Sequence, residues 1–307
     1  MLAVEFRRSP RLGYALTAAA ATMFAGSASL ARFLLDDGMS AWHLTELRSA
    51  LSFALLVAWL ALTNRELLRV ERADISRLAF LGVFGLAAVQ STYFAAIARI
   101  DIGVALTIQY LGPLMILLWL RLAHGRHLAP SLWGAVGLSV LGSFFVVGAY
   151  DVDGLDALGL VASVATAIAF AVNLVASERA GVRLDARTTL AWGFGFCTLF
   201  WLVVRPPWTF PFALFDDLGH VALALGVGVL GTLIPFVLIV TALRHISAAR
   251  TGVVATLEPV IAAIIAWPVH DQVLAVPQIG GIVVVMGAVA WVQSHRPVVE
   301  AEAAPVH

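Results

Sequence analysis

Long runs of apolar residues fill almost the whole chain, separated by short turns that carry Pro, Gly, Asp or Arg. A membrane-spanning helix needs about 20 mostly apolar residues, and the runs reach that length. They are too uniform for barrel strands, in which apolar and polar residues alternate. Because a backbone in lipid must satisfy its own hydrogen bonds, the runs predict helices. The pattern predicts ten spans, over residues 12–33, 43–63, 77–98, 101–122, 131–149, 156–177, 187–205, 219–243, 247–267 and 276–293.

The composition agrees with an all-α polytopic membrane protein and excludes other classes. Of the 307 residues, 61% are hydrophobic and 12% are charged, which no soluble domain of this size carries. The 19 basic and 19 acidic residues cancel, so no nucleic-acid partner is expected. No lysine is present, which excludes lysine Schiff bases and the Walker phosphate loop. Cys197 is the single cysteine, and no cluster has metal-ligand spacing, so no cofactor is expected.

Arginine placement predicts the orientation of the spans. With the N-terminus in the cytoplasm, 15 of the 19 basic residues fall on the inner side. The outer turns hold only Arg99 and Arg205, while Arg32 and Arg48 lie within spans. Such a bias predicts an inner-membrane protein of a bacterium with both termini in the cytoplasm. A cleaved signal peptide is the alternative for the first span, which follows three arginines.

The chain also contains an internal repeat at an offset of 146 residues. Five of the matched pairs are Gly13 with Gly159, Gly82 with Gly228, Gly85 with Gly231, Pro113 with Pro259, and His124 with His270. The repeat divides the chain into an N-terminal tail (1–11), a first half (12–150), a second half (151–296) and a C-terminal tail (297–307). Five spans per half, an odd number, insert the second half upside down relative to the first. Two inverted five-helix repeats are typical of secondary transporters with alternating access.

The fourth and ninth spans resemble those of a known family. Residues 103–114 read GVALTIQYLGPL, residues 256–263 read TLEPVIAA, and Arg48 lies early in the second span. Together with two five-helix halves, these features resemble the EamA type of the drug/metabolite transporter superfamily, and most closely its threonine/homoserine exporters. The family pattern places Gly-Glu before the fifth helix of each half, where this chain has Gly125-Arg126 and Asp271-Gln272.

Two charged residues inside the spans are candidates for substrate binding. A charge at mid-membrane costs roughly 2.5–3.5 kcal/mol on insertion scales, so each needs a reason. Glu258 lies near the midplane, where it is either a protonatable coupling group and partner for a substrate amine, or a structural carboxylate beside Pro259. Arg48 either binds a substrate carboxylate in a bidentate fork or forms a structural ion pair. Glu46 lies only two residues before Arg48, so the two do not share a helix face.

Five uncharged polar residues complete the candidate site. Gln90 and Tyr93, three residues apart, share a face of the third span. Gln109 and Tyr110 precede Pro113, which frees the carbonyl of Gln109. These residues and Asn173, in the sixth span, either line a path for a polar solute or bond neighbouring helices.

The sequence therefore predicts a secondary transporter that exports amino acids or related metabolites, with the proton as candidate coupling ion. Its partners are a small-molecule substrate, the lipid bilayer and, through glycine-rich fifth and tenth spans, a second copy in a homodimer. A flippase for a lipid or lipid-linked sugar, and a multidrug or amine exporter, are the alternatives on the same fold. An intramembrane enzyme is not expected, because no confident span supplies a histidine to serve as a base.

The topology can be tested with reporter fusions. Fusions after residues 37, 100, 153, 216 and 271 should report outside, and those after 68, 125, 183 and 296 inside, because of the arginine bias. Opposite results at two or more sites would refute the ten-span topology.

Overall fold

The computed structural model describes residues 9–100, 102–150, 156–270 and 275–294 and forms a helical bundle. Within these residues there are no strands, which confirms the all-α prediction. The tails, the turn around Asp151 and the Asp271-Gln272 pair lie outside them, as do the side chains of Arg32 and His270. The α-helices are α1 (Pro10–Asp36), α2 (Ala41–Thr63), α3 (Arg72–Phe80), α4 (Ala88–Ile97), α5 (Ile102–Gln109), α6 (Gly112–His124), α7 (Pro130–Val146), α8 (Ala157–Gly181), α9 (Ala186–Val204), α10 (Leu218–Gly228), α11 (Ile234–Ala242), α12 (Ala248–Ala255), α13 (Leu257–His270) and α14 (Val276–Ser294).

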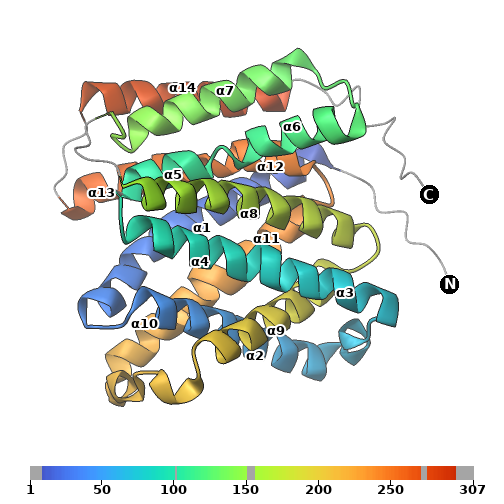
Figure 1. Ribbon diagram of the computed structural model, residues 1–307, viewed down its shortest axis with the longest axis vertical. Helices are drawn as coiled ribbons and strands as arrows, with labels where there is room; N and C mark the ends of the chain where they lie inside the picture. The colour runs from blue at the N-terminus through green and yellow to red at the C-terminus, as the bar shows by residue number, and fades with distance from the viewer. Residues whose placement is uncertain (1–8, 101, 151–155, 271–274, 295–307) are drawn as a thin grey trace.

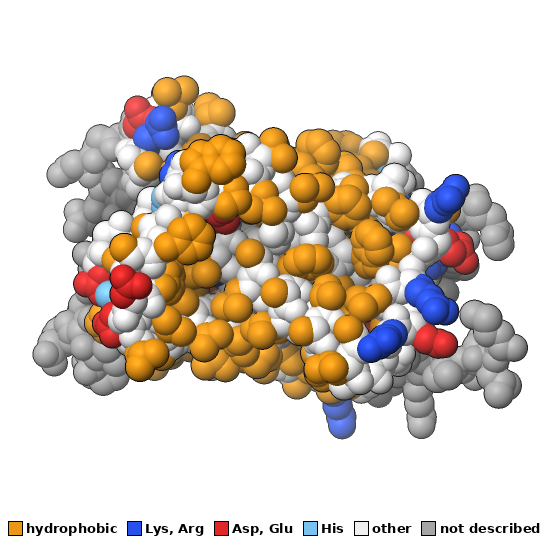
Figure 2. All heavy atoms as spheres, turned by 90° about the horizontal axis from the view of Figure 1, so that it is seen from below, with side chains coloured by type: hydrophobic (Ala, Val, Ile, Leu, Met, Phe, Trp, Pro, Cys, Tyr) orange, Lys and Arg blue, Asp and Glu red, His pale blue; other side chains and the backbone are white. Residues whose placement is uncertain are grey.

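Among the described residues, eight helical segments are long and apolar enough to cross a membrane. They cover residues 41–63, 72–97, 104–124, 157–181, 186–204, 218–242, 248–265 and 276–294, which match eight of the ten expected spans. The two other expected spans correspond to α1, of 27 residues, and α7, a shorter apolar helix of 17. In Figure 2 the hydrophobic side chains cover the middle of one face, while charged side chains gather at its two ends. This distribution is that of a multi-pass membrane protein.

Two of the long segments are broken at positions offset by 146 residues. The first break follows α5, where Leu111 N–H donates to Ile108 O at 3.0 Å in a tightened turn before Pro113. The second follows α12, where Thr256 N–H donates to Val253 O at 3.3 Å before Pro259. Proline cannot donate to the preceding turn, so both breaks follow from the local sequence.

Two π-helical segments also lie at equivalent positions of the halves. Residues 81–87 connect α3 to α4, and residues 229–233 connect α10 to α11. A π-helix widens the helix by one residue and leaves carbonyl groups poorly paired, and such segments frequently occur at functional sites. Gly85 and Gly231 stand at matching places in the two segments.

The halves contact each other through glycines, and two of these contacts occur twice with the halves exchanged. A Cβ on Gly13 would lie 3.0 Å from His245 Cβ. A Cβ on the equivalent Gly159 would lie 3.0 Å from the Cβ of Arg99, the residue that stands 146 positions before His245. Similarly, Gly85 faces Asn173, while Gly231 faces Ser27. Small residues let helices approach closely within a membrane. The two halves therefore interlock through equivalent pairs of helices.

Helices α7 and α14 pack side by side at one end of the bundle (Figure 1). A Cβ on Gly142 would lie 2.6 Å from Val285 Cγ2 and 2.9 Å from Val285 N, whereas a Cβ on Gly137, one and a half turns earlier, would have nothing within 4 Å. The glycines of the two helices thus have different roles, and Gly142 forms the contact.

We expect Gly142→Ala to lower thermal stability in detergent, since the backbone of α14 would have to move, at a cost of about 1–3 kcal/mol. Gly137→Ala is the matched control in the same helix. It should leave the melting temperature unchanged or raise it, because alanine favours helix over glycine by up to about 1 kcal/mol. Equal effects of the two substitutions would contradict this packing.

Candidate substrate site between the two halves

The two helix breaks meet at one hydrogen bond. Tyr110 follows the last residue of α5, and Glu258 lies in the first turn of α13. The Tyr110 hydroxyl donates to Glu258 Oε2 at 3.0 Å, so a residue of the first half holds a carboxylate of the second. The Tyr110 ring is 1% exposed and meets Phe170 edge-on, at 6.2 Å between ring centroids. The packing of the ring therefore fixes the position of the phenol hydroxyl that donates to the carboxylate.

Arg48 brings a positive charge to the same region. Its Nε donates to Thr232 Oγ1 at 2.7 Å, and its Nη2 donates to Gly231 O at 2.9 Å. Both acceptors belong to the second π-helix, so the guanidinium bonds a carbonyl that the widened helix leaves available. The charges of Arg48 and Glu258 interact, and Tyr93 interacts with both. The candidate site thus contains a cation and an anion from different halves.

Two amide oxygens near the first π-helix have no partner among the described residues: Gln90 Oε1 and Asn173 Oδ1. Gln90 uses its amide nitrogen, which donates to Leu86 O at 3.1 Å. Asn173 is 6% exposed and packs against Gly85. A buried acceptor without a donor is costly, so these oxygens suit a bound donor or water.

The structure thus relates six of the seven predicted site residues to one another, through hydrogen bonds, through interacting charges or by their place along the π-helices. Tyr110, Glu258, Arg48 and Tyr93 interact electrostatically. Asn173 packs against Gly85 of the first π-helix, and Gln90 lies on the same segment, five residues after Gly85. Gln109 ends α5 and is partly buried, without a described link to the charged pair. Whether these residues bind substrate is taken up below.

Sequence reasoning did not identify a second buried arginine cluster. Arg250, 9% exposed, donates from Nη1 to the Tyr14 hydroxyl at 2.6 Å and to Val292 O at 3.1 Å. This cluster joins the beginning of α1 to the end of α14, so both described ends of the chain lie at one face. Arg250 counted only as an inner-side arginine in the sequence, since nothing local signals its long-range partners.

Glu46 and Arg48 separate as expected from their spacing. The Nη2 atom of Arg205 lies 3.1 Å from His43 Nε2, and the charge of Arg205 interacts with that of Glu46. Glu46 is 5% exposed. It therefore belongs to a cluster between α2 and α9, apart from the π-helix that binds Arg48.

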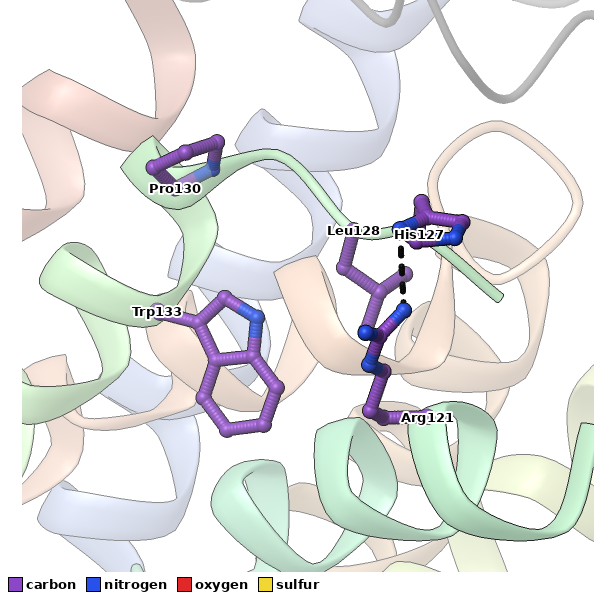
Figure 3. A pocket seen from close by; sticks show the side chains of 5 residues that line it. All are labelled: Arg121, His127, Leu128, Pro130 and Trp133. Atoms are coloured by element: carbon purple, nitrogen blue, oxygen red, sulfur yellow. Dashed lines mark hydrogen bonds between the residues drawn. The ribbon is translucent and has the colours of Figure 1, made fainter. Parts of the chain in front are cut away.

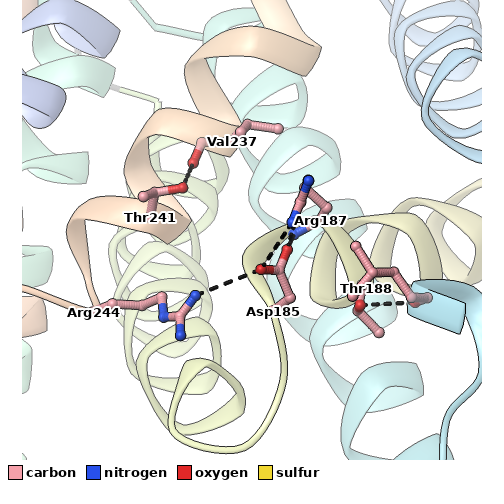
Figure 4. A network of polar contacts seen from close by, with 7 residues as sticks. Asp185, Arg187, Thr188, Val237, Thr241 and Arg244 are labelled. Carbon is pink, nitrogen blue, oxygen red and sulfur yellow. Dashed lines mark hydrogen bonds and ion pairs between the residues drawn. The ribbon is translucent and has the colours of Figure 1, made fainter. Parts of the chain in front are cut away.

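A charged network at one end of the bundle is centred on Asp185 (Figure 4). Asp185 caps α9, where its Oδ1 accepts from the backbone N–H of Arg187 at 2.9 Å and from Arg187 Nε at 2.8 Å. Arg244 Nη1, beyond α11, lies 3.6 Å from Asp185 Oδ2. Burial acts to raise the pKa of Asp185, but the hydrogen bonds from Arg187 and the charges of Arg187 and Arg244 outweigh it and hold the pKa below its usual value.

Two ion pairs between the halves occupy equivalent positions, with their charges exchanged. His220 Nε2 lies 2.8 Å from Asp37 Oδ2, and Arg183 Nη1 lies 3.9 Å from Asp74 Oδ1. Asp37 and Arg183 are 146 residues apart, as are Asp74 and His220. Arg183 also reaches Glu71 at 3.4 Å, and His220 reaches Asp217 at 3.6 Å. Each pair joins one residue of the first half to one of the second.

The fold is that of a multi-pass helical membrane protein built from two similar halves. The sequence pattern of the EamA-like transporter family matches residues 11–148 and again residues 157–293. The chain belongs to this family, and the resemblance of its fourth and ninth spans to drug/metabolite transporters is confirmed.

Relatives with known names agree with a transporter. The chain is 26% identical over 243 residues to the threonine/homoserine exporter RhtA of Escherichia coli K12, covering 78% of this chain and 77% of that protein. It is 25% identical over 224 residues to an uncharacterized transporter of Archaeoglobus fulgidus, covering 72% of this chain and 78% of that protein. One solved crystal structure superposes with a TM-score of 0.74 over 92% of this chain and 96% of its own, at 19% identity. That likeness concerns the fold alone.

The depressed pKa of Asp185 predicts a pH-dependent contribution to stability. The carboxylate stabilises the protein at pH values above the unfolded pKa of about 4, and this contribution is lost as the pH falls through the lower folded pKa. Asp185→Asn should therefore lower stability at pH 7 by roughly 0.5–1 kcal/mol, allowing for solvent screening, and by progressively less below about pH 4. Thermal melting of the variant and the wild type in detergent, at pH 7 and below about pH 4, measures this loss of stability. Asp156→Asn, at the cap of α8 where Asp156 Oδ1 accepts from Gly159 N, controls for loss of a capping carboxylate. A deficit that persists in acid would contradict the ionic role.

Proposed function

We propose that this protein is a secondary transporter of the bacterial inner membrane that exports amino acids or closely related metabolites. Membership of the EamA-like family supports transport, and the similarity to the threonine/homoserine exporter RhtA supports export of threonine-like solutes. The observation that carries the proposal is the Tyr110–Glu258 hydrogen bond beside Arg48, which places opposite charges where the two halves meet.

An inverted repeat of ten spans with cytoplasmic termini is the proposed architecture. The equivalent glycine contacts, helix breaks and π-helices at one constant offset support two halves related by a pseudo-two-fold axis in the membrane plane. The Arg250 cluster, which joins α1 to α14 at one face, supports termini on one side. Alternating access would then consist of rocking one half against the other.

The chemistry of the site favours a zwitterionic solute. Arg48 suits a carboxylate, since its guanidinium can donate in a fork. Glu258 and the free oxygens of Gln90 and Asn173 suit an ammonium group, which only donates. A free α-amino acid carries both groups. A simple amine or an anion would satisfy one part of the site and leave the other charge without its partner.

Glu258 is also the proposed proton carrier. As a carboxylate it accepts the hydrogen bond from Tyr110 and balances Arg48. When a proton binds, that balance is lost, so the affinity for a cationic amine falls and release is favoured. A proton and a substrate ammonium group thus compete for the Glu258 carboxylate. This competition is sufficient for the exchange of a proton for the substrate.

The two ion pairs between the halves are proposed to close opposite faces. With cytoplasmic termini, Asp37–His220 lies outside and Asp74–Arg183 inside. Both pairs are formed in this structure. Opening either face requires its pair to separate, because each pair spans the boundary between halves.

We expect Glu258→Gln to insert and fold like the wild type, because the change preserves shape and removes a buried charge. In proteoliposomes it should abolish the pH dependence of threonine or homoserine transport and leave solute binding or exchange partly intact. Glu258→Ala should be worse, because it also loses packing. Transport of each solute across an imposed pH gradient is the measurement.

Glu66→Gln is the matched control, since Glu66 is an exposed glutamate of the short turn after α2. It should transport with wild-type rates and pH dependence. Wild-type rates and pH dependence of Glu258→Gln would make Glu258 structural. Transport of lipid, or of amine drugs without amino acids, would favour the alternative substrates instead.

Cross-linking tests the two closing pairs. In a Cys197→Ser background the chain has no other cysteine. Paired cysteines at 37 and 220, or at 74 and 183, should each block transport when joined by a short thiol cross-linker, and reduction of a cleavable linker should restore it. Transport that continues with either pair joined would exclude that pair from gating. Single cysteine variants treated in the same way control for modification.

A further inference from the structure

A cavity of about 410 Å³ opens at the surface where α6 ends and α7 begins, lined by Arg121, His127, Leu128, Pro130 and Trp133. Figure 3 shows the Arg121 and His127 side chains together on one side of it, with Trp133 facing them across the space. The membrane span that contains α6 ends at His124, so the cavity lies at the edge of the apolar region. None of its lining residues belongs to the proposed transport site, and the nearest in sequence, Arg121, follows Tyr110 by 11 residues.

The charge of this cavity is positive. The Arg121 guanidinium lies 2.9 Å from His127 through Nη1 and Nδ1. Because arginine can only donate, His127 Nδ1 accepts and its proton is on Nε2, which remains a donor. No Asp or Glu occurs between residues 102 and 150, while residues 121–127 contain two arginines and two histidines. The segment therefore presents hydrogen-bond donors and positive charge without a local counter-ion.

The first turn of α7 forms the opposite wall. Pro130 begins α7, a helix of 17 residues, and Trp133 follows within that turn. The N-terminus of a helix carries partial positive charge and favours anions. Two donors and a helix N-terminus thus converge on one open space.

The apolar surface beside the cavity favours a lipid. Leu118, one turn before Arg121 on α6, is 37% exposed, and Leu122, which directly follows Arg121, is 80% exposed. An inorganic anion would use the donors alone, whereas a phospholipid would place its phosphate at the donors and its acyl chains along the leucines.

We propose that this cavity binds the phosphate of an anionic phospholipid. Arg121 and His127 donate to the phosphate oxygens, Trp133 packs on the glycerol region, and α6 guides the acyl chains. Basic pockets beside membrane helices are suited to such headgroups. This site is independent of transport, since it requires neither Glu258 nor Arg48.

Native mass spectrometry of the purified protein tests the proposal, with phosphatidylglycerol, phosphatidylcholine and inorganic phosphate as the three probes. Phosphatidylglycerol should bind more tightly than phosphatidylcholine, and the double variant Arg121→Gln, His127→Gln should bind it at least about fivefold more weakly. Arg65→Gln, which changes an exposed arginine at the end of α2, is the matched control and should bind like the wild type.

Thermal melting separates the two sources of phosphate. Phosphatidylglycerol should raise the melting temperature of the wild type more than that of the double variant, and millimolar inorganic phosphate should not reproduce this difference. Equal binding of both lipids, equal loss in Arg65→Gln, or full competition by inorganic phosphate would overturn the proposal. If the double variant does not fold, the single variant His127→Gln, at an exposed position after α6, provides the same comparison.

Discussion

A guanidinium held among membrane helices needs a compensating charge, and the arrangement around Arg48 depends on that need. The second π-helix supplies the hydrogen-bond acceptors Gly231 O and Thr232 Oγ1, and the negative charge of Glu258 acts on the guanidinium at a distance beyond that of a direct ion pair. Glu258 in turn receives a hydrogen bond from Tyr110. Removing one partner of such a pair leaves the other charge buried and costly. The positions of α2, α5, α13 and the π-helix are therefore mutually determined, since each contributes one group.

The scaffold is duplicated, but the polar groups are not. Phe194 stands at the position equivalent to Arg48, Gly112 at that of Glu258, and Thr256 at that of Tyr110. Phe194 is fully buried in an apolar cluster with Leu86, beside the first π-helix. Repetition thus supplies the helix breaks, the widened helices and the close glycine contacts, while divergence places one cation and one anion. A site for an asymmetric solute needs such divergence, because two identical half-sites would present two like charges.

Much of this could be predicted from sequence, because the responsible signals are local. Apolar runs predicted the helices to within a few residues, Pro113 and Pro259 predicted the breaks, and the charge of Glu258 marked it as exceptional. The partners of these residues could not be predicted, since they lie 148 residues away for Tyr110 and Glu258 and 184 for Arg48 and Thr232. The π-helices were also missed. Gly82, Gly85, Gly228 and Gly231 marked their positions in the repeat, but hydrophobic periodicity does not distinguish a π-helix from an α-helix.

The internal compensation of charge also determines what a solute must offer in order to enter. Arg48 and Glu258 carry opposite charges that interact electrostatically, so under the proposed function a bound solute would interact with both. A cation would compensate the charge of Glu258 and leave that of Arg48 uncompensated. An anion would compensate the charge of Arg48 and leave that of Glu258 uncompensated. A zwitterion inserted between them compensates both charges at once and adds donors for Gln90 and Asn173. Under the proposed function, these two opposite charges would favour a solute that carries both, since a solute with a single charge compensates only one of them.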